Sequence, residues 1–533
     1  MIQNRKINRR EALRLMGMTG AVVALAACAP AVAPQTTEEG APAGEKKVIS
    51  VSHIGGGSQE ASEKSQRMIM LRAAFPDIQI ENQWVSYAGY LEKIPLAIAS
   101  GDLADIQFAN AFNDVPLMME NEVIAETGPL LEDQGQDILA ATPAQAWDST
   151  IYDGKQYAIA HNVYDLNIWL TQYRKDWLDT LGLGVPQTID EYGEVLRAFS
   201  KNDPDGNGVA DTYGRLLYQT IRFDDDIFHA FGAAVGHHMN GFWRERDGEM
   251  ALDWVQPQMK DALAFMRQLW ADGAFHPDSI SIPLGQKDNA FLGGIAGNVY
   301  TSWQALDSNL ARVQTVTPTA EIAPGPAPEG PGGRGFTGEG WPWTFVLSVN
   351  AQYPADCVRV VNWFYQPTQT AQIFCEGVPE VTNKGFNDKG WCIEFSREEK
   401  AAMGDDWTDK QNEVTDITTF WGLWLPIGTL GGTDILPNMP DDMKQHFQDM
   451  LAQKYSETAL EAKAISQEYI RITAKKRPVE ADKEFWPGLQ TRFAEFISQA
   501  VAGTIDLDQG WDEWLGYFDA NGGLLITEQV NAL

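Results

Sequence analysis

The fold is decided by residues 78–106, IQIENQWVSYAGYLEKIPLAIASGDLADI, which predict a strand, a helix and a second strand in succession. The β-rich run 78–85 leads to a helical pattern at 90–98. The turn at 101–105 then leads into another buried strand that begins at Ile106. Strands and helices that alternate in this way imply an α/β fold with a mostly parallel sheet.

Further elements are predicted on both sides of this segment. Residues 47–52 form a β-rich run that ends at the glycines 55–57, and Pro76 closes the helical pattern that follows. Residues 318–340 are dense in proline and glycine, which predicts a surface loop that leads into an apolar strand at 341–349. A helical pattern begins at Thr188, where Thr188 and Glu191 have the capping-box spacing, and further helices are predicted at 257–271, 354–375, 443–455 and 485–502.

Length and charge narrow the class of protein. The 533 residues are many for one domain but fit two lobes, and no apolar run after residue 46 is long enough to span a membrane. The 40 Lys and Arg residues against 73 Asp and Glu residues give a net charge of −33, which argues against nucleic acid as a partner. Cys357, Cys375 and Cys392 have no metal-ligand spacing, so at most one pair can form a disulfide, and their redox state stays open.

The first residues are predicted to be an export signal. A basic stretch at 5–10 precedes an apolar run at 21–27 that stops at Cys28, so residues 1–27 are expected to be a signal peptide. The segment 25–28, LAAC, resembles the lipobox at which bacteria attach a lipid to the cysteine, and Arg9-Arg10 resembles a twin-arginine signal. Residues 28–46 are then a lipid-anchored flexible linker, because their composition cannot form a core. An ordinary secretory signal with a chance cysteine is the alternative, and the export route stays open.

A series of motifs spans nearly all of the chain after residue 46. In order they are Ala99-Ser100-Gly101-Asp102-Leu103-Ala104-Asp105-Ile106; Tyr152-Asp153-Gly154-Lys155-Gln156-Tyr157-Ala158-Ile159; Asn167-Ile168-Trp169-Leu170 with Trp177-Leu178; Phe291-Leu292-Gly293-Gly294-Ile295-Ala296-Gly297 up to Trp303; and Gly503-Thr504-Ile505-Asp506-Leu507-Asp508 with Trp511-Asp512 and Gly522-Gly523-Leu524. This order resembles the extracellular solute-binding proteins of ABC importers, of the maltodextrin- and oligosaccharide-binding type, in a lipoprotein branch. Ala104 departs from the family pattern, which has proline there.

The resemblance implies a two-lobed periplasmic-binding-protein-like fold of type II, with a central cleft between α/β lobes that crossing strands join. On this basis the N-terminal lobe is expected at 47–160 plus 345–385 and the C-terminal lobe at 161–344 plus 386–533. The implied function is an extracytoplasmic, lipid-anchored protein, expected to be a monomer, that captures a carbohydrate and delivers it to the membrane permease of an ABC transporter. No catalysis is expected.

Residues 203–211, DPDGNGVAD, are the most specific single site in the sequence. They place oxygen ligands at alternate positions and a glycine where the loop must turn, which is the logic of a calcium-binding loop. The predicted ligands of a structural Ca²⁺ are Asp203, Asp205, Asn207, the Val209 carbonyl and Asp211. Position twelve is Gly214 rather than glutamate, so another oxygen must complete the shell, and the alternative is a solvated turn without metal.

The 18 tryptophans are more than a soluble core ordinarily needs. Sugars present C–H faces that stack on indole and hydroxyls that need dense hydrogen bonding, so a saccharide site combines aromatic platforms with polar side chains. For each tryptophan the alternative is a packed core residue. The predicted ligand-binding residues are Trp303, Trp341, Trp343, Trp243, Trp421 and Trp424, together with Asn110, Phe112, Tyr164, Asp165 and His53 at predicted strand ends.

A secreted, calcium-containing polysaccharide-degrading enzyme is the alternative function. Asp224, Asp225 and Asp226, with Glu245 and Asp247, could supply the pair of carboxylates that glycoside hydrolysis needs. Such clusters are expected by chance in a chain this acidic, and no nucleophile elbow, zinc-binding helix or phosphate loop accompanies them. A surface lipoprotein that serves only adhesion or signalling is a third possibility. Binding without catalysis is therefore the favoured function, with the charge of the saccharide left open because Arg222, Arg244 or Arg334 could reverse the local field.

Overall fold

The structure of the protein is a computed structural model. It describes residues 46–533 apart from 55–58, 64–65, 112, 143, 153, 161–168, 218–220, 222–223, 237–238, 283–287, 339–342, 367–383, 392, 405–440 and 476–477. Cys28, the predicted signal peptide and the predicted linker up to residue 45 lie outside the described residues, as do Cys375 and Cys392. Among the described residues Cys357 is a buried free thiol.

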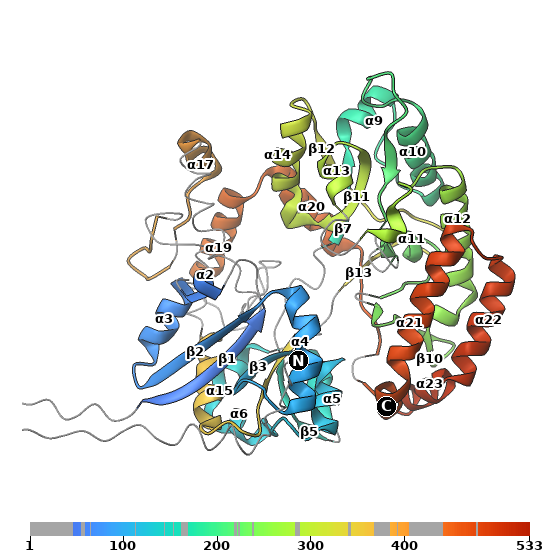
Figure 1. The fold of residues 1–533 in the computed structure, drawn as a ribbon. Coiled ribbons are helices and arrows are strands. Elements are labelled where there is room, and N and C mark those ends of the chain that lie inside the picture. Colours follow the sequence, from blue (N-terminus) through green and yellow to red (C-terminus); the bar gives the residue numbers. More distant parts are fainter. Residues whose placement is uncertain are drawn as a thin grey trace, which may run out of the picture. The chain divides into compact units, whose positions relative to one another are not determined.

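A five-stranded sheet of order β2-β1-β3-β14-β6 contains the opening segment of the chain (Figure 1). Its strands are β1 (Lys47–Ile54), β2 (Ile78–Val85), β3 (Ile106–Asn110), β6 (Ala158–Ala160) and β14 (Trp343–Leu347). Strand β1 runs parallel to β2 and β3, whereas β14 runs antiparallel to both β3 and β6. The expected parallel start of the sheet is therefore confirmed, and a strand from far along the chain completes it.

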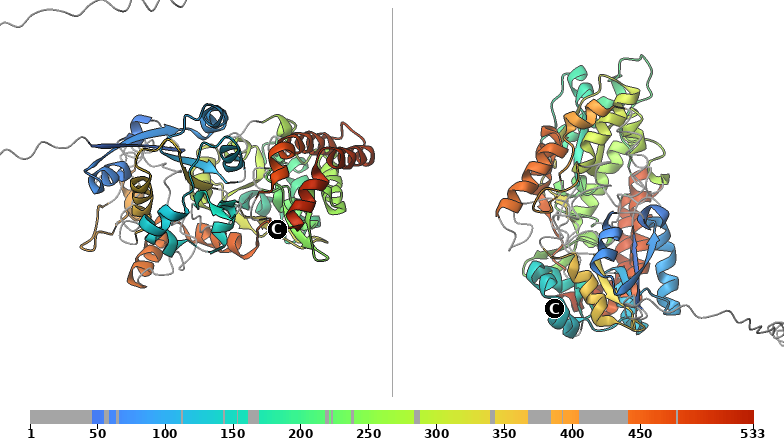
Figure 2. Two further views of the ribbon diagram at one scale, coloured as in Figure 1. Left: turned by 90° about the horizontal axis from the view of Figure 1, so that it is seen from below. Right: turned by 90° about the vertical axis from the view of Figure 1, so that its left-hand side faces the viewer.

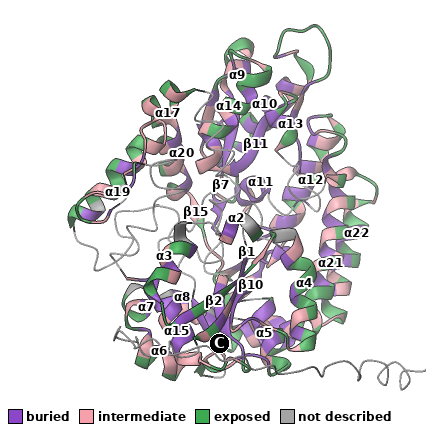
Figure 3. Ribbon diagram, turned by 60° about the vertical axis from the view of Figure 1, so that its left-hand side comes forward, coloured by how far each residue is buried: buried purple, intermediate pink, exposed green. Residues whose placement is uncertain are grey.

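Burial and capping explain the segment 78–106. Strand β2 alternates buried and exposed residues over most of its length, while every residue of β3 is buried. Figure 3 shows buried residues, in purple, along β1 in the same sheet. Between them α4 (Tyr87–Ser100) begins at Ser86, whose hydroxyl accepts a hydrogen bond from the Gly89 amide. The helix ends at Gly101, which has a left-handed φ of 71° that glycine adopts without steric cost. The helix predicted at 90–98 thus starts three residues earlier.

A second, four-stranded sheet has the order β12-β7-β11-β8. Its strands are β7 (Trp169–Arg174), β8 (Tyr213–Arg215), β11 (Ala296–Ser302) and β12 (Ile322–Gly325). Strand β7 runs antiparallel to its neighbours β11 and β12, and only β8 and β11 are parallel, so the mostly parallel pattern does not extend to this sheet. The predicted loop 318–340 was wrong in part, since β12 and the short β13 (Phe336–Thr337) form within it.

Helices pack around the second sheet and form a group of their own. The capping box at Thr188 and Glu191 is confirmed and begins α10 (Ile189–Lys201), and α12 (Pro257–Ala271) has the predicted bounds. Helices α21 (Glu480–Ala502), α22 (Leu507–Ala520) and α23 (Gly523–Asn531) pack on one another, and α21 packs on α12 (Figure 2). The helix predicted to begin at 485 therefore begins five residues earlier.

The remaining helices and strands are shorter or lie at the periphery. The helices are α2 (Gln59–Glu63), α3 (Gln66–Ala74), α5 (Asp114–Glu120), α6 (Gly128–Gln134), α7 (Gln136–Ala141), α8 (Ala144–Trp147), α9 (Lys175–Leu181), α11 (Asp225–Ala230), α13 (Asn289–Leu292), α14 (Leu306–Val316), α15 (Pro354–Trp363), α17 (Arg397–Met403), α19 (Asp441–Lys454) and α20 (Glu457–Glu468). The strands are β4 (Ile151–Tyr152), β5 (Lys155–Gln156), β9 (Trp243–Arg246), β10 (Glu249–Leu252) and β15 (Ile470–Arg471). No helix of the described residues is both long and apolar enough to cross a membrane.

The hydrophobic core divides between the two sheets. One cluster surrounds the five-stranded sheet, a second contains side chains of β7, α10, α12 and α21–α23, and a smaller third cluster packs against the four-stranded sheet. Trp391, Met443 and Met450 belong to the first cluster, although the sequence analysis assigned 386–533 to the second lobe. Trp343, assigned to the second lobe as well, begins β14 in the first sheet. The exact lobe boundaries stay a prediction.

Candidate functional site

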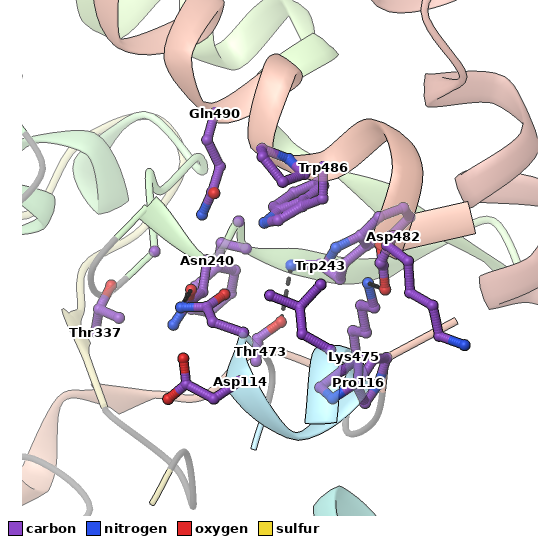
Figure 4. A pocket seen from close by; sticks show the side chains of 18 of the residues that line it. Asp114, Pro116, Asn240, Trp243, Thr337, Thr473, Lys475, Asp482, Trp486 and Gln490 are labelled. Carbon is purple, nitrogen blue, oxygen red and sulfur yellow. Dashed lines mark hydrogen bonds and ion pairs between the residues drawn. The ribbon is translucent and has the colours of Figure 1, made fainter. Parts of the chain in front are cut away.

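A pocket of about 200 Å³ opens between residues that follow the first sheet and residues of the second core (Figure 4). Asp114 and Pro116 on α5 lie on the side opposite Trp486 and Gln490 of α21 in this view. Gly236, the segment 240–243, the segment 337–338, and Thr473 and Lys475 also line it. The pocket is thus assembled from elements far apart in the sequence.

Two tryptophans form the apolar part of the wall. Trp243 begins β9 and Trp486 lies in α21, and both are more than nine-tenths buried. Trp486 stacks on Trp254 with a ring-centroid distance of 4.9 Å and an interplanar angle of 17°. The backbone amide of Trp243 donates a 3.0 Å hydrogen bond to the Thr473 hydroxyl. Both indoles are therefore held by packing before any ligand is present.

An ion pair lies beside these indoles. Lys475 Nζ is 2.6 Å from Asp482 Oδ2, and both side chains are buried to about nine-tenths. The Lys475 ammonium also lies 5.5 Å from the Trp243 ring centroid and 5.3 Å from that of Trp486. Burial lowers the pKa of Lys475 from its ordinary value, and the carboxylate of Asp482 opposes that effect. The backbone amide of Val479 donates to Asp482 Oδ2 as well, at 2.7 Å.

Two polar atoms of this wall have no partner among the described residues. They are Nε1 of Trp243, a hydrogen-bond donor, and Oδ1 of Asp482, an acceptor. A buried polar group without a partner costs roughly 1–3 kcal/mol, so such atoms are rare unless something else satisfies them. Both side chains line the pocket, and these two atoms, a donor and an acceptor, are buried in its wall without a partner among the described residues.

The opposite side of the pocket carries Asp114. Its carboxylate accepts hydrogen bonds from the Tyr90 hydroxyl and, at 2.7 Å, from the Asn110 backbone amide. Burial raises the pKa of Asp114 to about 6, although both hydrogen bonds oppose the shift. Near Asp114, the side-chain amide of Asn113 donates to Asn240 Oδ1 at 3.3 Å, which joins the two sides of the pocket.

A buried carboxylate behind the pocket fixes its floor. Asp225 accepts hydrogen bonds from the backbone amides of Val235 (2.6 Å) and Gly236 (3.2 Å) and from the Thr337 hydroxyl (2.7 Å). Thr337 is in turn 2.9 Å from Nε2 of His229, whose pKa burial lowers well below its ordinary value. Because Gly236 and Thr337 both line the pocket, Asp225 positions its wall and does not face a ligand.

The carboxylates proposed for hydrolysis are occupied with structure. Asp224 and Asp226 are buried against Arg215, whose Nη2 and Nη1 lie 2.5 Å and 2.9 Å from their oxygens. Arg215 also donates to the Tyr192 hydroxyl at 2.7 Å. Neither aspartate lines the pocket, and Glu245 and Asp247 belong to or border β9 without lining it either. None of the carboxylates predicted for hydrolysis therefore lines the pocket.

Several predicted ligand-binding residues lie elsewhere in the fold. Trp303 is fully buried in the core beside the four-stranded sheet, where its ring meets Tyr455. Trp343 stacks on Phe108 with centroids 5.0 Å apart. His53 is fully buried, 2.6 Å from Asn82 Oδ1, and burial lowers its pKa to about 4. None of the three lines the pocket: Trp303 and His53 are fully buried, and Trp343 is half-buried against Phe108.

The other predicted residues lie at the pocket, lie away from it, or fall outside the described part of the chain. Trp243 lines the pocket, and Asn110 contacts it indirectly through Asp114. Arg244 and Arg334 bind Asp253 and Glu329 and do not line it. The predicted residues that lie outside the described part of the chain are Trp341, Phe112, Tyr164, Asp165, Trp421, Trp424 and Arg222.

Sequence reasoning missed most of the pocket. Trp486, Lys475, Asp482, Asp114 and Gln490 carry no motif. The only local signal is Trp486-Pro487-Gly488, which places a proline and a glycine inside the long helix α21. A deliberate search for such breaks could have found Trp486, but not the residues it meets.

The loop 203–211 forms a compact network of exposed polar groups. Backbone amides of Asn207 and Gly208 donate to the two oxygens of Asp203, at 3.1 and 2.9 Å. The side-chain nitrogen of Asn207 lies 2.8 Å from Asp205 Oδ2 and 3.3 Å from Asp211 Oδ1. In the described part of the chain no group of three His, Cys, Asp or Glu side chains is placed to hold a metal ion, this loop included.

Comparison with known proteins places the chain. A family model described as bacterial extracellular solute-binding protein matches residues 57–371. Lipoprotein LipO of Bacillus subtilis is 27% identical over 248 residues, which are 45% of this chain and 47% of LipO. The fructooligosaccharide ABC transporter substrate-binding protein FusA of Streptococcus pneumoniae is 28% identical over 318 residues, 54% of this chain and 56% of FusA. The chain thus spans about half the length of the curated relatives it matches.

Solved structures match over a larger part of the chain. The alginate-binding protein AlgQ2, in a structure without calcium ion, has a TM-score of 0.68 at 17% identity and covers 92% of this chain and 98% of its own. FusA in complex with kestose has a TM-score of 0.67 at 18% identity, over 91% of this chain and 98% of its own. An EF-hand mutant of FusA matches with a TM-score of 0.61 at 18% identity, over 91% and 98%. The expected periplasmic-binding-protein-like α/β fold is therefore confirmed.

Proposed function

The chain belongs to the family of bacterial extracellular solute-binding proteins, and we propose that it captures a carbohydrate in the pocket at Trp243 and Trp486 for delivery to an ABC importer. The family is one of binding proteins, so the expectation of binding without catalysis is met. FusA, a relative of about the same fold, is described as binding fructooligosaccharides, which favours a saccharide for this chain as well.

The observation that carries the proposal is the composition of the pocket wall. Two fixed indoles stand beside amide, carboxylate and ammonium groups, namely Asn113, Asn240, Gln490, Asp114, Asp482 and Lys475. Apolar sugar faces stack on indole, while sugar hydroxyls require many hydrogen-bonding partners in a small space. A peptide or a lipid would use this combination less completely, because neither presents so many hydroxyls beside an apolar face.

The proposed mechanism is closure around the ligand. The hydrogen bond from Asn113 to Asn240 already joins the two sides of the pocket, and a ligand that contacts both sides would stabilise the closed arrangement. A membrane permease could then recognise the closed arrangement as a shift in population. The ligand itself would leave the pocket unchanged.

The test is a titration of the purified protein with a panel of oligosaccharides, followed by tryptophan fluorescence and then by chromatography of the sugar. Saturable quenching with intact sugar is expected, and shortened sugar would favour the hydrolase alternative. Trp486→Ala should weaken binding by about 100-fold or more, because stacking on an aromatic ring contributes on the order of 2–3 kcal/mol. Trp303→Phe is the matched control, since Trp303 is a buried tryptophan outside the pocket. Equal affinities for all three proteins would argue against this pocket.

Calcium binding at residues 203–211 is a second part of the proposal. Asp203, Asp205 and Asp211 supply oxygens of the kind that Ca²⁺ prefers, and Gly206 and Gly208 turn the loop at positive φ. The Asn207 amide nitrogen now lies between Asp205 and Asp211, and an amide flip would instead present its oxygen. Bound calcium would neutralise these carboxylates and hold the loop, with no part in chemistry.

Export and lipid attachment at Cys28 complete the proposal. The likeness to LipO, a lipoprotein, supports an anchored protein outside the cytoplasm. Metabolic labelling with palmitate in a bacterial host should mark the protein, and Cys28→Ala should abolish the label. Unchanged labelling of the Cys28→Ala variant would exclude this cysteine as the lipid site.

A further inference from the structure

The charged groups that line the pocket are already neutralised or acidic. Lys475 is paired with Asp482 at 2.6 Å, and Lys483 is paired with Glu480 at 3.1 Å. Asp114, across the pocket, forms no ion pair within the described part of the chain. No arginine occurs among the described lining residues. The wall therefore offers an anionic ligand no unpaired cation and exposes it to carboxylates.

The unsatisfied polar atoms of the wall favour a ligand that carries a particular chemical group. Trp243 Nε1 needs an acceptor, and Asp482 Oδ1 needs a donor. A hydroxyl can meet either need, since it accepts and donates. A carboxylate can accept from Trp243, but it has no proton for Asp482 and would place a second negative charge beside it in a region of low dielectric.

The position of Lys475 strengthens this argument. Its ammonium lies near the rings of both pocket tryptophans and contacts Asp482, so a ligand carboxylate could reach it only in competition with that aspartate. Removing Asp482 from Lys475 would leave a buried carboxylate without its cation, which is costly. The lysine therefore acts as a part of the wall and not as an anchor for anions.

We infer that the pocket takes a neutral, hydroxyl-rich saccharide and discriminates against uronates, with ligand hydroxyls that accept from Trp243 Nε1–H and donate to Asp482 Oδ1. This inference rests on the proposed function, because it names the class of saccharide for the same pocket. It separates this chain from AlgQ2, which matches it in fold and is described as binding alginate, a polymer of uronates.

The test compares two matched panels of short oligosaccharides by isothermal titration calorimetry on the purified full chain. One panel is neutral, with fructo-, malto- and xylo-oligosaccharides, and the other is acidic, with oligogalacturonate and alginate oligomers. At least one neutral sugar should bind about 100-fold more tightly than any uronate of similar length. Its affinity should also change less than about twofold between low and high salt, since a neutral ligand has no charge to screen.

Two variants test the assigned atoms. Asp482→Asn should weaken the binding of the neutral sugar by about 10- to 100-fold. It should also reduce the ratio of neutral-sugar affinity to uronate affinity, because the amide does not repel a carboxylate. Trp243→Phe removes the indole N–H and should weaken the binding of the neutral sugar by about tenfold. Trp177→Phe is the matched control, since Trp177 Nε1 is also buried without a partner among the described residues but lies in the core away from the pocket. The affinity of the Trp177→Phe variant for the neutral sugar should equal that of the wild type.

The results distinguish a failure of this inference from a failure of the proposed function on which it rests. A uronate that binds as tightly as every neutral sugar, or more tightly, overturns the inference and leaves the carbohydrate-binding function standing. If no sugar of either panel binds, the proposed function is overturned and the inference with it. If Asp482→Asn is poorly folded by circular dichroism, the ratio between panels in the wild type and the Trp243→Phe variant decides the question alone.

Discussion

The pocket and the loop 203–211 both gather carboxylates around polar groups, and they are built in opposite ways. The loop is one short stretch whose side chains bond to its own backbone, as in the bond from the Val209 amide to Asn207 Oδ1 at 2.7 Å. The pocket joins residues from 113 to 490 and buries its ion pair to about nine-tenths. Solvent screens the charges of the loop, whereas the pocket must satisfy each charge from within. A local motif can therefore tolerate an empty centre, but a buried wall with unmatched atoms indicates a ligand.

Glycine substitutions should break this contrast most strongly. Gly241 in the pocket wall and Gly206 in the loop both have positive φ, 76° and 69°. A Cβ on Gly241 would lie 2.7 Å from the Trp486 ring, while one on Gly206 would meet nothing within 4 Å. Gly241→Ala should therefore lower the free energy of unfolding by about 3 kcal/mol and displace Trp486, but Gly206→Ala by only about 1 kcal/mol.

Denaturant unfolding of the two variants measures this difference, and sugar titration shows whether Trp486 has moved. Equal losses of stability in Gly241→Ala and Gly206→Ala would mean that the wall adapts to the added carbon. In that case the pocket would be no more rigid than the exposed loop.

Calcium should act on the loop and leave the pocket unaffected. At a calcium concentration 100 times the dissociation constant, binding should stabilise the protein by about 2.7 kcal/mol relative to a chelator. The melting temperature should rise by about 2–4 °C, and Asp203→Ala should abolish the rise. Sugar affinity should be the same with calcium and with chelator, since no loop residue lines the pocket. A calcium-dependent sugar affinity would contradict the separation of the two regions.

Without calcium, the repulsion inside the loop should be visible. The pKa of Asp205 is raised, mainly because the residue is partly desolvated and also because Asp203 and Asp211 lie nearby. Asp205→Asn should therefore be neutral or slightly stabilising in chelator and destabilising when calcium is present. A thermal melt in both conditions checks the change of sign.

A pH series should sharpen the contrast on the pocket side. Since the pKa of Asp114 is raised to about 6 in the folded protein, its contribution to stability is fully present below about pH 4 and is lost as the pH rises through 6. The stability of the wild type relative to Asp114→Asn should fall by roughly 1–3 kcal/mol between pH 4 and pH 7. Denaturant unfolding at four pH values measures it, and a flat difference would show that Asp114 stays ionised.

Local sequence patterns predicted the elements of the fold well. The strand at 78–85, the turn at Gly101 that ends α4, and the capping box of α10 depend on neighbours within a few residues, and each prediction is confirmed. The parallel pairing of β1 with β2 and β3 followed from the connecting helices. The antiparallel β14 and the strand β12 inside a proline- and glycine-rich segment did not follow, because a partner distant in sequence stabilises each of them.

The site was harder to predict for the same reason. Abundant tryptophan indicates a sugar site in general, but an indole in the core and an indole in a pocket look alike in sequence. The sequence therefore does not separate Trp303, which is buried in the core, from Trp486, which lines the pocket. Trp243, a residue predicted from the sequence, lines the pocket, although nothing in its neighbourhood distinguishes it from Trp254, which packs in the core.

The sequence by itself therefore determined the α/β elements, the family and the calcium-like loop, since each depends on residues close together in the chain or on their order along it. Which charges face the pocket depends on the tertiary structure, because burial and pairing arise between segments that are far apart in the sequence. Asp114, Lys475 and Asp482 acquire their roles from desolvation and from one another. These are properties of a packed wall and not of any single stretch of residues.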